Sequence, residues 1–334
     1  MKNFRFLLRC ILLLAVVYNG NALTSYAQTQ DTSLTCVFYN LENLFHPSDA
    51  PSKGDDEFTP VGSRRWSWQR YHQKITSVCK VLLSIDNWKL PDIICMCEIE
   101  NREVAEDLIK HPLMMHSNYD IIHRESPDHR DLDAMILYDP LRFKCIDTTW
   151  IPLVDQRGNV EKTREMVAAM FTSAKDTLLC IAAHWTSKYG GAYETEKKRM
   201  DQARILATYI DSILDAHPGI HLIAGGDFND NSTSKSIQIL TSHGGIREVL
   251  PENNAVTYKY QGKWERIDHV FIGQNHMYRQ CYCKVYSPGF LLEADEKYSG
   301  RKPYRTYSGY SYNGGISDHL PLLLTLDLRE LQDH

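Results

Sequence analysis

Side chains able to bind metal ions or transfer protons follow short apolar runs at several places in this chain. These segments, all rich in Asn, Asp, Glu or His, are residues 39–43, 97–101, 183–187, 225–230, 267–269 and 317–319. A single carboxylate after a strand is most often a turn residue or a helix cap. Turns and helix caps do not readily account for six segments that all carry these residue types. Because strand ends in α/β architectures converge on one edge of a sheet, we expect one shared site.

The residue types at that site indicate a cation beside proton-transferring groups. Glu42, Glu98 and Asp318 carry the hard oxygen ligands that Mg²⁺ prefers, with water and a phosphate completing its coordination. Histidines such as His184 and His319 can transfer protons near neutral pH. The pattern therefore predicts a metal site that also binds a phosphate group.

Short strands interleaved with helices must position these residues. The runs that predict buried strands are 34–39, 92–97, 133–138, 167–171, 178–183, 221–224, 267–272, 281–286 and 322–326. Apolar residues at helical spacing predict two helices, one over 68–85 and one over 200–214. No repeat or change of composition marks a linker. We therefore expect one α/β domain with mixed sheets covered by helices.

The motifs, taken in chain order, resemble those of the endonuclease/exonuclease/phosphatase superfamily. They read Asn-Leu-Glu-Asn, Glu-Ile-Glu-Asn, His-Trp-x-Ser, Gly-Asp-Phe-Asn-Asp, Ile-Asp-His and Ser-Asp-His-Leu-Pro, and span nearly all of the chain after its first 32 residues. The resemblance implies a deoxyribonuclease I-like α/β fold, a four-layer sandwich of two packed mixed β-sheets flanked by α-helices. It also implies a Mg²⁺-dependent phosphoesterase, with Mn²⁺ as a substitute, that cleaves its substrate by in-line attack of activated water.

The resemblance also assigns roles to individual residues. It implies that Glu98 is the principal metal ligand and that Asp318 and Glu42 support it. Asn40 and Asn229 match amides that hold the phosphate. Arg130 matches an arginine in bacterial members of the superfamily and would suit a phosphate contact, with a structural pair with Asp128 or Asp131 as the alternative. The catalytic residues that it implies are His319, Asp268, His184, Asp227 and Asn229. We expect His319, held by Asp268, to deprotonate the attacking water. His269 points to the opposite strand face and is expected to be structural.

The first 27 residues predict a secretory signal peptide that is cleaved near Ala27, leaving residues 28–334 as the mature domain. Lys2, Arg5 and Arg9 precede a short apolar run, and Ser25-Tyr26-Ala27 ends the segment. The expected location is secreted or periplasmic, and no membrane span is expected. The net charge of −5 would become more negative after cleavage, which weighs against long nucleic acids as substrates.

Of nine cysteines, eight remain after the expected cleavage. Cys36, Cys95, Cys97 and Cys180 lie in apolar runs, where free cysteine behaves as a small hydrophobe. We therefore expect mostly buried thiols, with one or two disulfides as the alternative.

Three functions compete at this point. The first is a nuclease or phosphodiesterase, the second is a small-molecule or lipid phosphoesterase of the inositol phosphate or sphingomyelin type, and the third is an inactive binding module. The expected partner is a phosphoester substrate, nucleic acid or small, and no obligate protein partner is implied. Specificity is expected in the irregular stretches 48–65 and 287–315.

Overall fold

The apolar runs of the sequence form nine of the twelve strands in two six-stranded sheets. The computed structural model describes residues 33–48, 54–155, 157–173, 176–242, 245–276, 278 and 280–327. The signal peptide expected over residues 1–27 lies outside the described residues. The described residues from Leu34 onward form one compact unit.

The first sheet contains the two strands that carry the acidic motifs near the start of the chain. Its order is β13 (Cys281–Val285), β18 (Leu322–Asp327), β1 (Ser33–Leu44), β2 (Ile93–Ile99), β4 (Asp133–Tyr138) and β3 (Asp120–Ile122). β1 and β2 are parallel, whereas β2 with β4 and β13 with β18 are antiparallel. The sheet is therefore mixed, as expected.

The second sheet is also mixed and carries the central histidine and aspartate motifs. Its order is β5 (Lys144–Ile151), β6 (Met166–Thr172), β7 (Thr177–His184), β8 (His221–Asp227), β12 (Asp268–Gly273) and β9 (Ile246–Glu248). β7 and β8 are parallel, and β12 runs antiparallel to β8. All nine strands predicted from the sequence are present; β4 has the predicted bounds, and the other eight differ at one or both ends.

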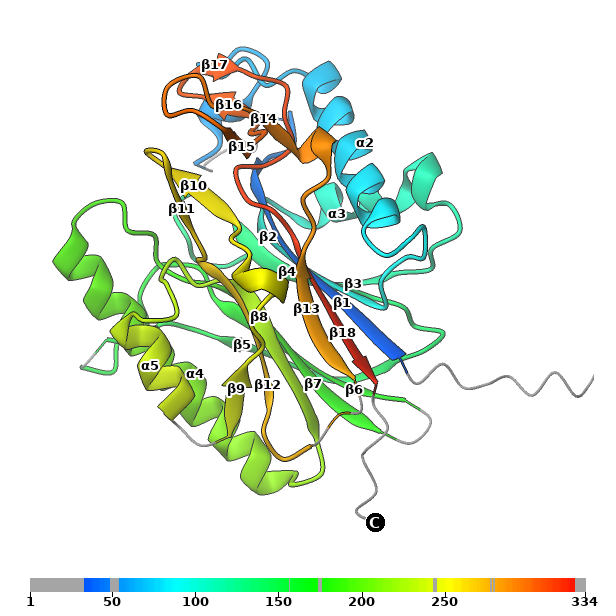
Figure 1. The fold of residues 1–334 in the computed structure, drawn as a ribbon, viewed down its shortest axis with the longest axis vertical. Coiled ribbons are helices and arrows are strands. Elements are labelled where there is room, and N and C mark those ends of the chain that lie inside the picture. The colour runs from blue at the N-terminus through cyan, green and yellow to red at the C-terminus, as the bar shows by residue number, and fades with distance from the viewer. Residues whose placement is uncertain are drawn as a thin grey trace, which may run out of the picture. The chain divides into compact units, whose positions relative to one another are not determined.

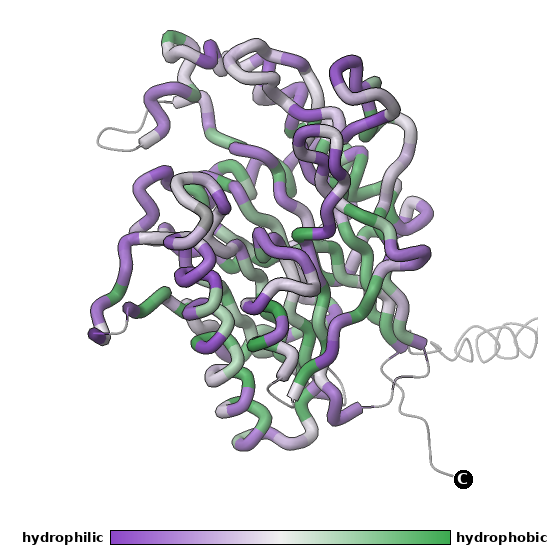
Figure 2. Tube along the Cα trace, turned by 60° about the vertical axis from the view of Figure 1, so that its left-hand side comes forward, coloured by the Kyte–Doolittle hydropathy of each residue, from purple (hydrophilic) through white to green (hydrophobic). Residues whose placement is uncertain are grey.

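Helices cover the outer face of each sheet, and the two sheets pack on each other (Figure 1). Helices α2 (Trp68–Ser84) and α3 (Arg102–Lys110) pack on the first sheet, and α4 (Ala192–Ala216) and α5 (Lys235–Ser242) pack on the second. A third apolar cluster joins the inner faces of both sheets. Figure 2 shows the hydrophobic segments concentrated in these layers. The expected four-layer sandwich is confirmed.

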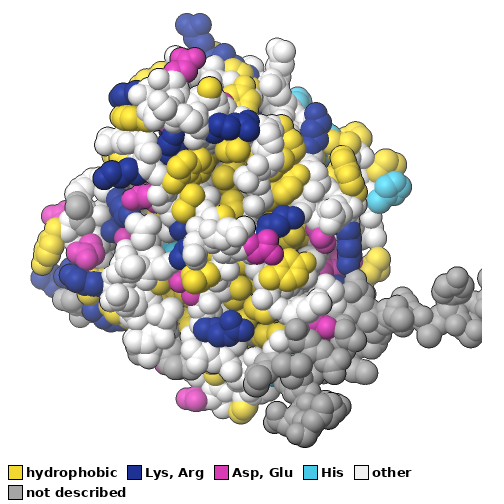
Figure 3. Space-filling view, in the orientation of Figure 1, with side chains coloured by type: hydrophobic (Ala, Val, Ile, Leu, Met, Phe, Trp, Pro, Cys, Tyr) yellow, Lys and Arg dark blue, Asp and Glu magenta, His cyan; other side chains and the backbone are white. Residues whose placement is uncertain are grey.

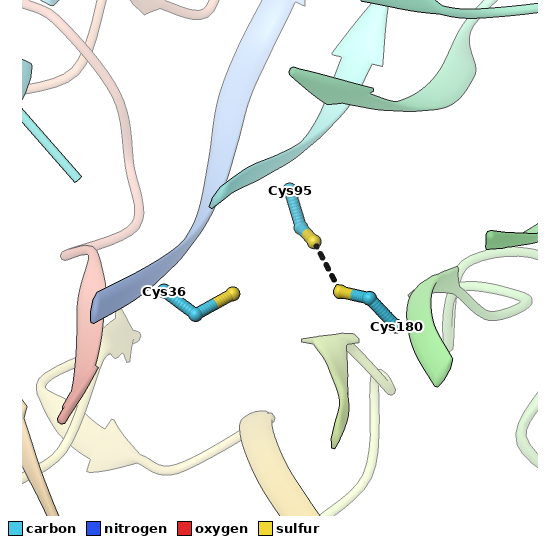
Figure 4. A group of neighbouring side chains, drawn as sticks. All are labelled: Cys36, Cys95 and Cys180. Atoms are coloured by element: carbon cyan, nitrogen blue, oxygen red, sulfur yellow. Dashed lines mark hydrogen bonds between the residues drawn. The ribbon is translucent and has the colours of Figure 1, made fainter. Parts of the chain in front are cut away.

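Three cysteines from the two sheets meet in the core between them. Cys36 on β1, Cys95 on β2 and Cys180 on β7 point toward one another (Figure 4), and the Sγ atoms of Cys95 and Cys180 are 3.6 Å apart. All eight cysteines of the described residues are free, and six of them are buried. This arrangement agrees with the expectation of buried thiols.

Small hairpins lie at one end of the sheets, at the top of Figure 1. They are β10 (Tyr258–Tyr260) with β11 (Lys263–Glu265), β14 (Leu292–Ala294) with β15 (Arg301–Pro303), and β16 (Tyr307–Ser308) with β17 (Ser311–Tyr312). The long irregular stretch near the chain's end thus contains two hairpins. Within the described residues, no helix has the length and hydropathy needed to cross a bilayer.

Candidate active site

Strand register places three of the predicted residues side by side. Asp227 at the end of β8 pairs with His184 at the end of β7 and with Asp268 at the start of β12. Because paired residues of neighbouring strands project to the same face, their side chains gather at one edge of the second sheet. Glycine is required here. Gly226 has φ of +136°, and a Cβ on it would lie 2.1 Å from the carbonyl oxygen of Ala183.

His319 and Asp268 form a buried hydrogen-bonded pair. Nδ1 of His319 donates to both carboxylate oxygens of Asp268, at 3.1 and 2.9 Å, and Asp268 also accepts a hydrogen bond from the Thr257 hydroxyl. The aspartate therefore fixes the ring and leaves Nε2 facing the site. Burial lowers the pKa of His319, but the carboxylates of Asp268 and Asp227 outweigh it and hold this pKa well above its usual value.

Asp227 lies at the centre of the site. Its Oδ2 accepts a hydrogen bond from Nδ2 of Asn40 at 3.1 Å, and lies 3.8 Å from Nε2 of both His184 and His319. Burial raises the pKa of Asp227, and although the charge of His319 opposes this effect, the pKa reaches about 7. A carboxylate with this pKa can accept a proton at neutral pH.

Glu98 occupies an irregular position in β2. The register with β4 shifts between Cys97 and Ile99, and Glu98 has φ of +60°. This strained backbone turns its side chain toward His184, with 3.7 Å between Oε1 and Nε2. Oε2 accepts a hydrogen bond from the backbone N–H of Asn43 at 2.8 Å. Among the described residues no hydrogen bond reaches Oε1, so this oxygen suits a hard divalent cation.

His184 is a buried histidine at the end of β7. Burial and the positive charges of Arg130 and His319 hold its pKa well below the usual value. Its Nδ1 has no hydrogen-bond partner among the described residues. A buried polar atom without a partner is uncommon in native proteins and often marks a functional site.

Asn229 and Arg130 border this group. Asn229 has φ of +53°, its backbone N–H donates to Oδ1 of Asp227 at 2.9 Å, and its Nδ2 donates to the carbonyl of Trp185 at 3.1 Å. These two bonds leave its amide oxygen for a ligand. The positive charge of Arg130 lowers the pKa of His184, and Nε of Arg130 lies 4.0 Å from Oδ1 of Asp128.

Glu42 and Asp318 are paired with an arginine that the sequence analysis did not single out. Nε of Arg305 lies 3.3 Å from Oε1 of Glu42, and Nη2 lies 2.9 Å from Oδ2 of Asp318. Asp227, Asp268 and His319 have ligand atoms that all lie within 4.8 Å of one another. Glu42, Glu98 and Asp318 do not form such a group within the described part of the chain. The metal roles of Glu42 and Asp318 therefore stay predictions.

Lys74 is a second residue of the site that was not predicted from the sequence. Its buried Nζ donates to the carbonyl of Glu42 at 2.5 Å and to the hydroxyl of Thr306 at 2.8 Å. Its position in the helical pattern, directly before Ile75 and three residues after Tyr71, could have identified it as inward-facing. No comparable signal distinguishes Arg305 within its long loop.

His269 lies away from the site, as expected from strand alternation. It is buried, with Nδ1 2.7 Å from Oε1 of Glu248 and Nε2 2.7 Å from the carbonyl of Asp230. Both ring nitrogens are thus occupied, which fits a structural role.

Comparisons with known proteins agree with this architecture. The model of the endonuclease/exonuclease/phosphatase family matches residues 35–328. Among curated proteins, none matches the chain in sequence.

Several solved structures share the fold at low sequence identity. An endonuclease/exonuclease/phosphatase from Bacteroides vulgatus has a TM-score of 0.57 at 17% identity, covering 89% of this chain and 99% of its own. A humanized TDP2 from D. rerio gives 0.55 at 14%, covering 89% and 99%. The human nocturnin catalytic domain, with bound sulfate, gives 0.54 at 14%, covering 88% and 94%. At these identities the likeness establishes the fold alone.

Proposed function

This chain belongs to the endonuclease/exonuclease/phosphatase family of metal-dependent phosphoester hydrolases, and we propose that it hydrolyses a phosphodiester or phosphomonoester bond by in-line attack of water. The observation that carries this proposal is the position of Asp227. Its carboxylate lies between Asn40, His184 and the buried pair of His319 with Asp268. A buried carboxylate surrounded by donors is suited to orient and deprotonate a water molecule.

We assign the proton of the attacking water to Asp227 rather than to His319. The resemblance of the motifs to the superfamily predicts His319 as the base instead. The two carboxylates beside its ring favour the charged imidazolium, which has no free nitrogen to accept a proton. In this proposal His319 instead donates a hydrogen bond from Nε2 to the phosphoryl oxygens, where negative charge increases in the transition state.

The remaining residues hold the phosphate and a cation. In this proposal the second Nδ2 hydrogens of Asn40 and Asn229 and the guanidinium of Arg130 donate to phosphoryl oxygens. Glu98 would hold a divalent cation through Oε1, and its hard oxygen donor fits Mg²⁺ or Mn²⁺. When bound, such a cation neutralises charge on the phosphoryl group.

The net charge of −5 favours a short or small substrate over a long nucleic acid. On the face shown in Figure 3, Lys and Arg side chains of the described residues are interspersed with acidic and hydrophobic ones, without one continuous basic area. Long nucleic acids bind by neutralising many phosphates. We also propose that the enzyme works after export, which rests only on the composition of residues 1–27.

A substrate panel tests the proposal directly. Purified protein with Mg²⁺ or Mn²⁺ should hydrolyse bis-p-nitrophenyl phosphate and at least one of plasmid DNA, RNA, sphingomyelin or inositol phosphates. Asp227→Asn should remove the activity and serves as the matched control for contaminating enzymes. Absence of turnover on every substrate, with metal shown to be bound, would identify a binding module instead.

A further inference from the structure

The guanidinium group of Arg305 bridges two of the three carboxylates expected to bind metal. It contacts Glu42 through Nε at 3.3 Å and Asp318 through Nη2 at 2.9 Å. Its side chain is 39% exposed, so solvent and a bound substrate can reach the guanidinium group. The position between these carboxylates is therefore already filled by a positive charge.

Both carboxylate oxygens of Glu42 already accept hydrogen bonds, whereas Oε1 of Glu98 accepts none among the described residues. Oε2 of Glu42 accepts a hydrogen bond from the backbone N–H of Thr306 at 2.6 Å, and Oε1 accepts from Arg305 and, at 3.5 Å, from the N–H of Tyr307. The side chain is only 5% exposed. Lys74 binds both the Glu42 carbonyl and the Thr306 hydroxyl. Glu42 thus anchors the segment that carries Arg305.

Arg305 is also held in place through its backbone. Nδ2 of Asn313 donates to the carbonyl of Arg305 at 3.2 Å, and the N–H of Ile316 donates to the carbonyl of Tyr304 at 2.6 Å. A Cβ on Gly315 would lie 2.1 Å from the carbonyl oxygen of Tyr304, so the two chain segments can approach this closely only with glycine there. A long, flexible side chain is thereby given one position.

Glu98 contrasts with Glu42. Its Oε1 accepts no hydrogen bond among the described residues, and its side chain is 15% exposed. The free carboxylate oxygen and the arginine-paired carboxylates are therefore separate parts of the same site. A second divalent cation between Glu42 and Asp318 would have to displace the guanidinium, because the two positive charges repel each other at contact distance.

We propose that Arg305 is a substrate-positioning residue that takes the place of a second metal ion. The site then binds one divalent cation, at Glu98, and Arg305 donates to a phosphoryl oxygen from Nη1, for which no acceptor is found among the described residues. A planar guanidinium fixed by two carboxylates presents its remaining N–H groups in a defined direction. This inference rests on the proposed phosphoester hydrolysis.

Binding measurements without turnover test it. Titration with Mn²⁺, followed by electron paramagnetic resonance, should give one bound ion per chain in the wild type. Glu98→Gln should weaken that binding. Arg305→Gln should keep the ion at Glu98 and gain a second, weaker one at the freed carboxylates. Binding of inorganic phosphate to the Mn²⁺-loaded protein should weaken about 10- to 100-fold in Arg305→Gln.

Two further variants control for folding and for charge. Lys302→Gln removes a positive charge from the same segment, where Lys302 pairs with Glu293, and should leave Mn²⁺ and phosphate binding unchanged. Arg305→Lys retains the charge without the planar fork and should keep one Mn²⁺ site while weakening phosphate binding less than Arg305→Gln does.

The outcomes separate this inference from the proposed function. Two Mn²⁺ ions in the wild type, or unchanged phosphate binding in folded Arg305→Gln and Arg305→Lys, would overturn the role of Arg305 even if the wild type hydrolyses phosphoesters. Conversely, the expected binding results with no hydrolysis of any substrate would contradict the proposed function alone.

Discussion

Nε2 of His319 lies 3.8 Å from Oδ2 of Asp227, while Nδ1 of the same ring donates to Asp268. One imidazole thus connects two buried carboxylates that come from different strands. The ring cannot reorient without breaking the bond to Asp268, so the distance between His319 and Asp227 is fixed by the fold. This geometry supports treating the three residues as one catalytic unit.

His319→Ala should lower kcat by about 10²- to 10⁴-fold, the range for losing a proton-transferring group or a transition-state hydrogen-bond donor. Asp268→Asn should share most of that loss, and the double variant should be little worse than either single one, because residues of one unit are not additive. Steady-state kinetics on bis-p-nitrophenyl phosphate would measure this. Retention of more than about a tenth of wild-type kcat by His319→Ala would contradict the assignment.

The pH dependence of kcat/KM follows from the two pKa shifts. Asp227 must be ionised to accept a proton, and burial raises its pKa to about 7, so activity should rise with pH and level off above that value. His319 must stay protonated, and its pKa is held well above the usual value, so a decline is expected only at alkaline pH. A flat profile from pH 5 to 8 would show that Asp227 is not the proton acceptor.

Much of this fold was predictable because buried strands are apolar over their whole length. The runs at 133–138 and 178–183 correspond to β4 (Asp133–Tyr138) and β7 (Thr177–His184), which are buried on both faces. β5 was missed because Lys144–Ile151 is an edge strand whose side chains are mostly exposed or half-buried. Helices α3 and α5 were missed because each is short and carries only three buried residues.

The sequence was enough to predict which residues form the site, but not how their side chains pair or which backbone conformations they adopt. Strand ends and motif order indicated Asp227, Asp268 and His319, which the fold brings together. The pairing of Glu42 with Arg305 could not be foreseen, because their contact joins positions 263 residues apart. The left-handed backbone of Glu98 was equally hidden, since its sequence continues an ordinary apolar strand.

Chelation should abolish turnover, and Mg²⁺ or Mn²⁺ should restore it. Glu98→Gln should raise the metal concentration needed for half-maximal rate at least about tenfold, because it replaces a charged oxygen ligand with a neutral amide. Titrating the rate against metal for both proteins gives this value. Full activity in excess chelator would refute metal dependence, and an unchanged requirement in Glu98→Gln would move the cation to other ligands.

Gly226→Ala should reduce the free energy of unfolding by about 3 kcal/mol or more. Its φ of +136° strains any L side chain, and the added Cβ would lie 2.1 Å from the Ala183 carbonyl that β7 presents to β8. Gly158→Ala is the matched control, because φ there is +85° and nothing lies within 4 Å, so strain alone should cost about 1–2 kcal/mol. Urea unfolding measures both, and equal losses would show that the contact with Ala183 relaxes.

The cysteines should be thiols in the native protein. Burial raises the pKa of the Cys36 and Cys95 thiols, and their distance from solvent protects them from reagents and oxidants. A thiol reagent added to native protein should therefore react mainly with the half-buried Cys145 and Cys281. After denaturation without reductant, all eight cysteines of residues 33–327 should react, to the same extent as in a sample reduced beforehand.

A loss of two reactive thiols that reduction restores would reveal a disulfide. Mass spectrometry should then test the Cys95–Cys180 pair, whose Sγ atoms are 3.6 Å apart. Two or fewer free thiols would mean that disulfides stabilise this fold and that the buried-thiol interpretation is wrong.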